Sequence, residues 1–112
     1  MKINRKQLDN NIVFYSFDGA LDTLVEDEIK IIMNSDLDNN IPYFILDLSE
    51  VEFIMSTIIG FLISFQNKLK ENKGKLIILN PSDEVKIVFK VLGLNLMFEF
   101  SKSLELAKSK LS

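Results

Sequence analysis

The sequence contains no cysteine and no histidine. Without cysteine the chain has no disulfide and no thiolate nucleophile, an absence typical of a reducing compartment. Without histidine it cannot carry a Ser-His-Asp triad or a phosphohistidine, and it lacks the imidazole that the usual zinc and non-haem iron sites require. These two absences remove several common catalytic and metal-binding classes.

Glycine is sparse as well, and the four glycines, at positions 19, 60, 74 and 93, are isolated from one another. Phosphate-binding loops of the P-loop and dinucleotide types need clustered glycines, so neither is present. No uninterrupted apolar segment approaches the ~20 residues of a membrane span. The start of the chain, residues 1–7, has basic residues but no apolar stretch behind them, which does not support a signal peptide. We therefore expect a cytoplasmic protein without a membrane span.

Positive charge is also limited, since 13 Lys and Arg stand against 16 Asp and Glu, giving a formal net charge of −3. Such a chain has no overall positive field to attract phosphate backbones, so nucleic acid is not an expected partner. The length of 112 residues, with 47% apolar and 26% charged residues, fits one globular domain with one ordinary core. We expect residues 1–112 to form a single domain.

Strand patterns alternate with helix patterns along most of the chain. The predicted strands are 2–8, 12–17, 43–48, 75–79 and 97–100; the predicted helices run from 23 to about 34, from 57 to 71, from 80 to 93, and from Ser101 or Ser103 onward. The order ββαβαβαβα predicts an α/β fold with a mixed, mainly parallel sheet of four to five strands and about four helices. The first strand should be an antiparallel edge.

Several element boundaries are predicted from turn and cap residues. Thr23 with Glu26 forms a plausible capping box for the first helix. That helix should end near residues 34–35 and be followed by a polar loop at 36–40. Gly74 should close the second helix in a left-handed conformation.

The stretch that organises the chain leads from a strongly apolar strand at 43–48 to Ser56 and Thr57. A short acidic connection separates the strand from the two hydroxyls, and another apolar-periodic run begins at Ile58. Ligands and modifications on parallel sheets tend to lie at the carboxyl ends of the strands, where this stretch places Ser56. On spacing alone Ser56 is expected to be a helix N-cap. Alternatively, a phosphate added there would be accepted by the helix N-terminus.

The acidic residues of this region, Asp47, Glu50 and Glu52, are interpreted as a solvated loop after the strand. Nothing in the sequence pairs them with a base, a metal partner or an electrophile stabiliser. We therefore predict no catalytic residue, metal or cofactor, and expect that the protein is not an enzyme.

The second helix is apolar over about 200° of its circumference, more than the ≳100° stripe that is enough to face a sheet. The first and third helices are expected to cover the excess. An apolar helix start with Met55 beside it would also make a protein-binding patch.

Taken in order, the motifs of the whole chain resemble the STAS domain family, specifically the small single-domain anti-sigma factor antagonists of bacteria. Residues 17–22 are similar to the family's Gly-x-Leu-Asp turn. The other segments that carry the likeness are 44–57, 72–76, 80–82, 91–94 and 97–98. The likeness covers nearly the full length, and the ordered set of segments is more specific than any one of them. The resemblance implies a STAS fold over residues 1–112.

The resemblance further implies a switch between partners. In such antagonists the unphosphorylated protein binds an anti-sigma factor that is also a serine kinase, phosphorylation of a Ser at the start of the second helix breaks the complex, and a metal-dependent serine phosphatase resets it. ATP and metal belong to the partners, and a monomer is favoured when the protein is free. Ser56 falls on the acceptor position, with Thr57 as the alternative. The implied partner-binding residues are Asp22, Met55, Ser56, Thr57, Ile58, Ile59 and Phe61.

Two positions depart from the family pattern Asp-Ser-Ser/Thr-Gly-Leu, because Met55 replaces the Asp and Ile58 replaces the Gly. The departures fit either a divergent partner or a STAS domain that binds without being phosphorylated. A second hypothesis is therefore a STAS subunit of another assembly, such as a stress-signalling complex or a lipid-transport ATPase, without a phosphate switch. A third is a phosphoacceptor receiver-like domain, with Asp47 near the end of its central strand.

Overall fold

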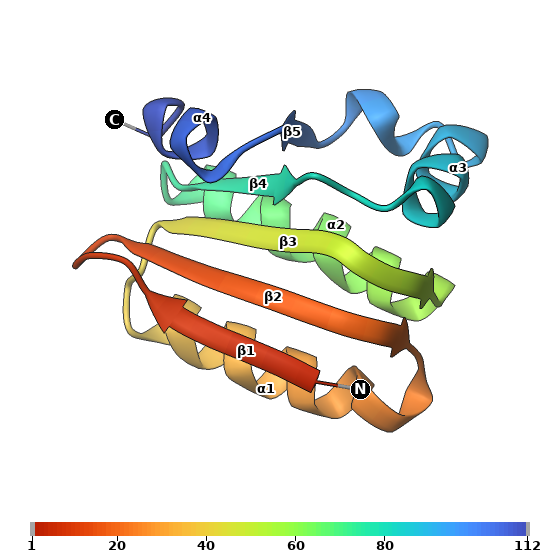
Figure 1. Ribbon diagram of the computed structural model, residues 1–112. Coiled ribbons are helices and arrows are strands. Elements are labelled where there is room, and N and C mark those ends of the chain that lie inside the picture. The colour runs from red at the N-terminus through yellow and green to blue at the C-terminus, as the bar shows by residue number, and fades with distance from the viewer. Residues whose placement is uncertain (1, 112) are drawn as a thin grey trace.

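The computed structural model describes residues 2–111 and contains the predicted order of strands and helices (Figure 1). The elements are β1 (Lys2–Gln7), β2 (Ile12–Leu21), α1 (Thr23–Asp38), β3 (Tyr43–Ile54), α2 (Ser56–Glu71), β4 (Lys75–Leu79), α3 (Asp83–Val91), the 3₁₀ turn η1 (Leu94–Leu96), β5 (Glu99–Ser101) and α4 (Leu104–Ser109). Within residues 2–111 no helix is both long and apolar enough to span a membrane.

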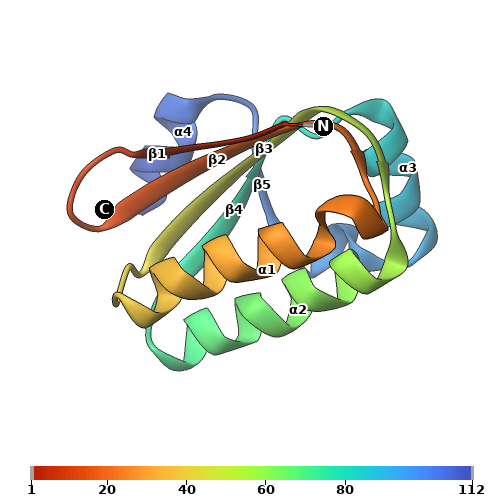
Figure 2. The ribbon, with the colours of Figure 1, turned by 90° about the horizontal axis from the view of Figure 1, so that it is seen from below.

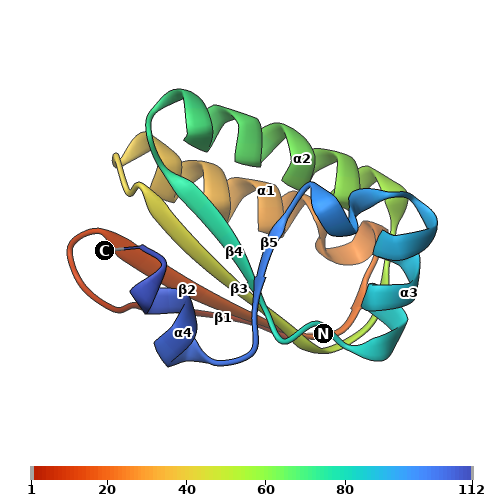
Figure 3. The same cartoon turned by 90° about the horizontal axis from the view of Figure 1, so that it is seen from above.

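The five strands form one mixed sheet in the order β1-β2-β3-β4-β5. β1 pairs antiparallel with β2 at one edge, and all other neighbours are parallel, as predicted. α1 and α2 lie side by side on one face of the sheet and α4 lies on the other, while α3 lies beyond the end of β4 (Figures 2 and 3). Because α1 and α2 both follow parallel strands, they begin at the same end of the sheet.

The core lies on both faces of the sheet. The larger cluster, which contains Phe44 and Phe65, fills the space beneath α1 and α2. A smaller cluster, which contains Ile45 and Ala107, lies beneath α4. Successive residues of β3 therefore point into different clusters, which explains why residues 43–48 are apolar without alternation.

Strands β2 and β3 are longer than predicted. They stay paired through Gly19 with Val51 and Leu21 with Ile54, across two irregularities in the register. The predicted end of the second strand at residue 17 is therefore wrong, and so is the predicted acidic loop after residue 48. Backbone pairing with a neighbouring strand decided these boundaries, and the side-chain pattern does not report it.

The first helix begins at Thr23 as predicted, but its N-cap and its end differ from the prediction. Its N-cap is Asp22, whose carboxylate accepts a hydrogen bond from the Leu24 amide at 3.0 Å, so the predicted capping box at Thr23 is wrong. The helix also continues past residues 34–35 to Asp38. The predicted polar loop at 36–40 is thus largely helical.

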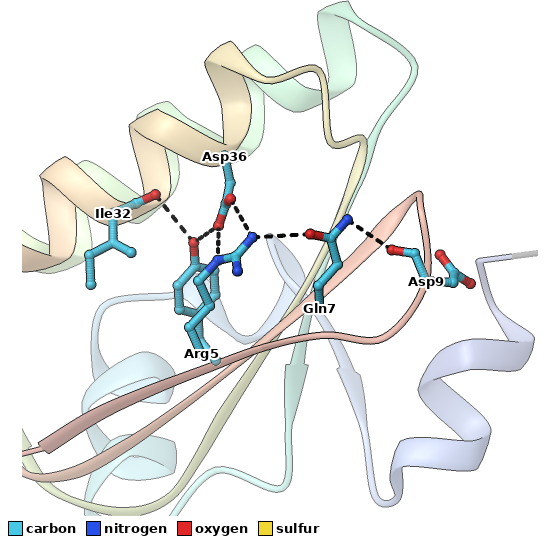
Figure 4. Close-up of polar contacts among 6 residues, drawn as sticks. Arg5, Gln7, Asp9, Ile32 and Asp36 are labelled. Carbon is cyan, nitrogen blue, oxygen red and sulfur yellow. Dashed lines mark hydrogen bonds and ion pairs between the residues drawn. The ribbon is translucent and has the colours of Figure 1, made fainter.

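Asp36 explains that extension, because its buried carboxylate is held by two other elements (Figure 4). Arg5 of β1 donates to Asp36 through Nε at 2.8 Å and Nη2 at 2.7 Å. The Tyr15 hydroxyl of β2 donates to the same carboxylate and also lies 3.3 Å from the Ile32 carbonyl oxygen. Burial, followed by the bond to Asp36, raises the pKa of Tyr15 above its usual value. We call this set of Arg5, Tyr15 and Asp36 the clamp.

Gly74 has a different role from the one predicted. The left-handed residue after α2 is Lys73, with φ of 61°, and not Gly74. A Cβ at position 74 would lie 2.3 Å from the Pro42 carbonyl oxygen. Glycine is therefore required because two segments of backbone approach closely.

The C-terminal elements shift slightly from the prediction. The last strand is Glu99–Ser101 and not 97–100, because Met97 is the C-cap of η1 and pairing with β4 begins at Glu99. Ser103 caps α4 by accepting from the Leu106 amide at 3.2 Å, which decides between the two predicted starts. Ser82 likewise caps α3.

Candidate functional site

The junction between β3 and α2 places Ser56 at the carboxyl end of a central strand (Figure 1). β3 ends at Ile54, and Met55 is the only residue between strand and helix. The Met55 amide donates to the Leu21 carbonyl oxygen at 2.9 Å, which fixes the junction to the end of β2. Ser56 is therefore the first residue of α2, and the residue before it is bound to the end of β2.

Ser56 does not cap its helix. The N-cap position belongs to Met55, whose thioether side chain makes no capping hydrogen bond. The prediction of Ser56 as an N-cap is wrong, since the helix begins one residue earlier than the spacing indicated. The Ser56 side chain is exposed, and within residues 2–111 its hydroxyl has no hydrogen-bond partner.

The start of α2 also leaves backbone donors open. The amides of Ile58 and Ile59 both donate to the Met55 carbonyl oxygen, at 3.1 and 3.2 Å. The amides of Ser56 and Thr57 have no acceptor in the part of the chain that the structure describes. Two free N–H groups at the positive end of a helix dipole form an environment that favours an anion.

Thr57 differs from Ser56 because it contacts α1. Glu26 receives a hydrogen bond from Lys30 at 2.9 Å, and this bond, with a weaker contribution from the Thr57 hydroxyl, lowers the pKa of the Glu26 carboxyl below its usual value. The Thr57 hydroxyl is thus turned toward a carboxylate. Of the two predicted acceptors, Ser56 has the less engaged side chain.

The structure does not bring Ile58 and Ile59 to the predicted partner surface. Their side chains are 1% and 3% exposed and belong to the core beneath α2. A partner would therefore touch them only through the backbone. The same burial means that the bulk of Ile58 points away from the Ser56 hydroxyl.

The remaining predicted residues lie close to Ser56 in different settings. Asp22 caps α1 and is half-buried. Met55 is half-buried and packs against the core. Phe61 is half-buried, with its ring centroid 5.6 Å from that of Phe65, one turn further along α2.

Sequence reasoning missed Gly60, which lies one turn after Ser56 on the same face of α2. A Cβ at position 60 would meet nothing within 4 Å, so packing within the chain does not require glycine there. Glycine in a helix interior costs about 1 kcal/mol relative to alanine. An isolated glycine inside a helical pattern was the signal that could have drawn attention to this face.

Ser56 lies outside three cavities of the structure. Their volumes are about 560, 430 and 340 Å³, and Ser56 lines none of them. Within residues 2–111 no group of three or more His, Cys, Asp or Glu residues is arranged to hold a metal ion. The arrangement can present an exposed hydroxyl to a macromolecule.

Asp47 lies in the interior of β3 and not near its end. The strand continues to Ile54, and the Asp47 carboxylate accepts a hydrogen bond from the Ser49 amide at 2.9 Å. The receiver-like hypothesis placed Asp47 at the end of a central strand, and the longer β3 removes that basis.

The chain is similar in sequence pattern and in fold to known proteins. The sequence pattern of the STAS domain family matches residues 3–107. The anti-sigma factor antagonist SpoIIAA in its unphosphorylated form is 20% identical, with a TM-score of 0.85 over 97% of this chain and 96% of that one. The Bacillus cell fate determinant SpoIIAA in its phosphorylated form is 19% identical, with a TM-score of 0.78 over 97% and 99%.

An anti-sigma factor antagonist from Mycobacterium paratuberculosis is 18% identical, with a TM-score of 0.84 over 98% of this chain and 92% of that one. At these identities the similarity establishes a common fold. Comparison with curated protein sequences gives no match.

Proposed function

Because the chain belongs to the STAS domain family, we propose that it is a non-enzymatic anti-sigma factor antagonist controlled by phosphorylation of Ser56. Unphosphorylated, it binds an anti-sigma factor that is also a serine kinase. Phosphorylation ends the complex, and a metal-dependent serine phosphatase restores the binding form. ATP and metal are bound by these partners and not by this chain.

The observation that supports this proposal most directly is the exposed, unpartnered Ser56 hydroxyl beside two free amides. A kinase can reach the hydroxyl without unfolding the helix start. The phosphate adds about −1.5 to −2 charges, and a helix N-terminus favours negative charge. The fold therefore tolerates the modification while the local surface changes sign.

The two departures from the family pattern are compatible with this role. The family's Asp would lie at the N-cap position, where Met55 supplies no side-chain acceptor. An N-cap side chain accepts from the second or third amide of its helix, so the absence of the Asp leaves the Thr57 amide free for a phosphate beside the free Ser56 amide. Ile58 replaces a glycine without obstructing Ser56, because its side chain is in the core.

The proposed contact surface consists of Ser56, Gly60 and the exposed apolar side chains that flank them at this end of the molecule. Phe53, three residues before Ser56, is 53% exposed, and Leu24 in the first turn of α1 is 89% exposed. Docking would remove these apolar groups from water, which stabilises a complex. A phosphate at the centre of such a contact would have to be desolvated, which opposes docking.

The direct test is incubation with a candidate serine kinase of the same organism and ATP, followed by mass-spectrometric mapping of the phosphate. We expect modification at Ser56, its loss in Ser56→Ala, and its persistence in Thr57→Ala. Ser56→Asp should weaken kinase binding, whereas Thr57→Val should not. Phosphate on Thr57 alone, or undiminished modification of Ser56→Ala, would refute the assignment of Ser56.

Gly60 provides a second test that leaves the acceptor intact. Gly60→Gln places a side chain on the proposed contact surface, where the folded chain itself has room for it. We expect at least tenfold weaker binding to the anti-sigma factor. The matched control is Asn67→Gln, an exposed change two turns further along α2 that should leave binding unchanged. Equal binding by both variants would place the contact elsewhere.

A STAS subunit of another assembly without a phosphate switch is the second candidate. The absence of the family's Asp at position 55 is the observation that favours it. It predicts tight binding to an unrelated partner that ATP does not affect and that Ser56→Asp leaves intact. Isothermal titration with and without ATP separates the two functions.

A further inference from the structure

The cavity of about 560 Å³ lies between α3, β5 and α4, away from Ser56. These elements run along one edge of the molecule (Figure 1). The volume of the cavity falls within the range of about 300–1,000 Å³ typical of pockets for small organic ligands. The STAS switch proposed above does not use this cavity.

The floor of the cavity is apolar and largely fixed. Phe89 of α3 is 1% exposed and meets Phe100 of β5 edge to face, with ring centroids 6.1 Å apart. Leu106 of α4 also lines the cavity and is 53% exposed, whereas the next residue, Ala107, is buried in the cluster beneath α4. An apolar ligand body would cover side-chain surface that water now contacts.

The rim of the cavity is basic. Four lysines line it, and within residues 2–111 no Asp or Glu does. Lys86 and Lys90 are one turn apart on α3 and so lie on the same side of that helix. Lys102 follows β5.

Three of these lysines have no anionic partner. Lys110 donates to the Phe100 carbonyl oxygen at 2.6 Å and lies 3.9 Å from Glu99. Lys86, Lys90 and Lys102 form no ion pair with any residue from 2 to 111. Unpaired cations clustered on a chain of net charge −3 attract an anion to this place and not to the surface in general.

We infer that this cavity binds a small amphipathic acid from solution, with an apolar body on Phe89, Phe100 and Leu106 and a carboxylate or phosphate at the lysine rim. A purely polar anion would leave the aromatic floor in contact with a polar group. A neutral apolar molecule would gain nothing from the lysines, which bind carboxylates and phosphates as point charges. Only a ligand with both parts matches both halves of the cavity.

The test is an NMR titration of the full chain with decanoate, below the concentration at which it forms micelles and at low salt. We expect saturable shifts of Phe89, Phe100 and Leu106 resonances. Decyltrimethylammonium, which has the same chain with the opposite charge, should bind at least tenfold more weakly. Equal binding of the two amphiphiles would overturn the proposal.

Two matched triple variants test the lysine rim at equal net charge. Lys86→Gln with Lys90→Gln and Lys102→Gln should weaken decanoate binding at least tenfold. Lys68→Gln with Lys70→Gln and Lys73→Gln, which removes three exposed lysines near the end of α2, should leave it unchanged. All six lysines are exposed, so both variants should fold, and circular dichroism verifies this. Equal loss of decanoate binding in both variants would mean that the net charge of the chain, and not the lysine rim, attracts the ligand, and would overturn the proposal.

A lipid bilayer also presents apolar chains with phosphate groups. Cosedimentation with vesicles distinguishes binding to a bilayer from binding of a free amphipathic acid. Vesicles of phosphatidylglycerol and phosphatidylcholine should not carry the chain down. Cosedimentation without decanoate shifts at the cavity would overturn the proposal in favour of a membrane-surface contact.

Discussion

The two ends of the layer formed by α1 and α2 differ in how completely their polar groups are used (Figure 2). At the end where both helices finish, Asp36 is buried and bound by Arg5 and Tyr15. At the end where they begin, Ser56 is exposed and its hydroxyl and amide have no partner within residues 2–111. We call these the closed end and the open end. The closed end ties α1 to β1 and β2. The open end presents an exposed hydroxyl and is available for a partner.

Breaking the clamp should have the largest effect on stability. Asp36→Ala leaves the Arg5 guanidinium and the Tyr15 hydroxyl without their acceptor in a mostly buried place. Breaking buried pairs typically costs 3–5 kcal/mol, and because Arg5 is 35% exposed we expect about 3 kcal/mol. Urea unfolding measures this loss as a lower transition midpoint.

Asp38→Ala is the control for that experiment, since Asp38 is exposed and ends the same helix. Removing a carboxylate from a helix C-terminus should leave stability unchanged or raise it slightly. If Asp36→Ala and Asp38→Ala unfolded at the same urea concentration, the clamp would not be the main source of stability at the closed end.

Two glycines sharpen the comparison further, one at each end of α2. Gly74→Ala at the closed end drives a Cβ to 2.3 Å from the Pro42 oxygen, and forced backbone shifts of this kind cost about 1–3 kcal/mol. Gly60→Ala at the open end meets nothing within 4 Å and should instead stabilise by about 0.5–1 kcal/mol. Thermal unfolding should therefore move in opposite directions for the same substitution. A rise in the transition temperature of Gly74→Ala would contradict this.

Tyr15→Phe removes a single hydroxyl from the clamp and should cost about 1–1.5 kcal/mol at neutral pH. The same variant has a pH signature. Burial raises the pKa of Tyr15, so above about pH 10 the unfolded chain loses this proton while the folded chain keeps it. The stability that depends on neutral Tyr15 is therefore complete below pH 10 and declines as the pH rises.

The measurement is the free energy of unfolding between pH 8 and pH 11. We expect a shallower decline in Tyr15→Phe than in the unaltered chain. Tyr43→Phe, which retains Tyr15, is the control and should show the full decline. It distinguishes the contribution of Tyr15 from a general loss of stability at alkaline pH.

The sequence predicted the fold better than it predicted the junctions. The order of elements and the antiparallel edge follow from apolar periodicity, which depends on burial and is visible in the residues. The clamp was missed because Asp36 stands in a polar run that is typical of a loop. Its burial depends on Arg5 and Tyr15, which are distant in the sequence.

At the candidate site the sequence identified Ser56 but not its setting. The prediction of Ser56 as the N-cap failed because β3 continues for six residues past Leu48, so that Met55 alone separates β3 from α2. The length of β3 is set by its pairing with β2, and the acidic residues of this stretch do not reveal that pairing. The resemblance implied Ile58 and Ile59 as partner-binding residues, but both side chains are buried. Which residues of the wide apolar arc of α2 face the sheet depends on the rotation of the helix, which the sequence does not give.

The smallest expected effect is the one that bears most directly on the open end. Because Ser56 makes no capping bond, Ser56→Ala should change the free energy of unfolding by less than about 0.5 kcal/mol. Ser82 is the matched serine at the start of α3, where its Oγ accepts from the Val85 amide at 3.3 Å and donates to the Val51 oxygen at 2.6 Å. Ser82→Ala should therefore cost about 1–2 kcal/mol in the same urea titration. Equal losses would mean that Ser56 stabilises its helix after all. A smaller loss for Ser56→Ala than for Ser82→Ala would indicate that the exposed Ser56 hydroxyl has no structural role at the open end, where it is available to a partner.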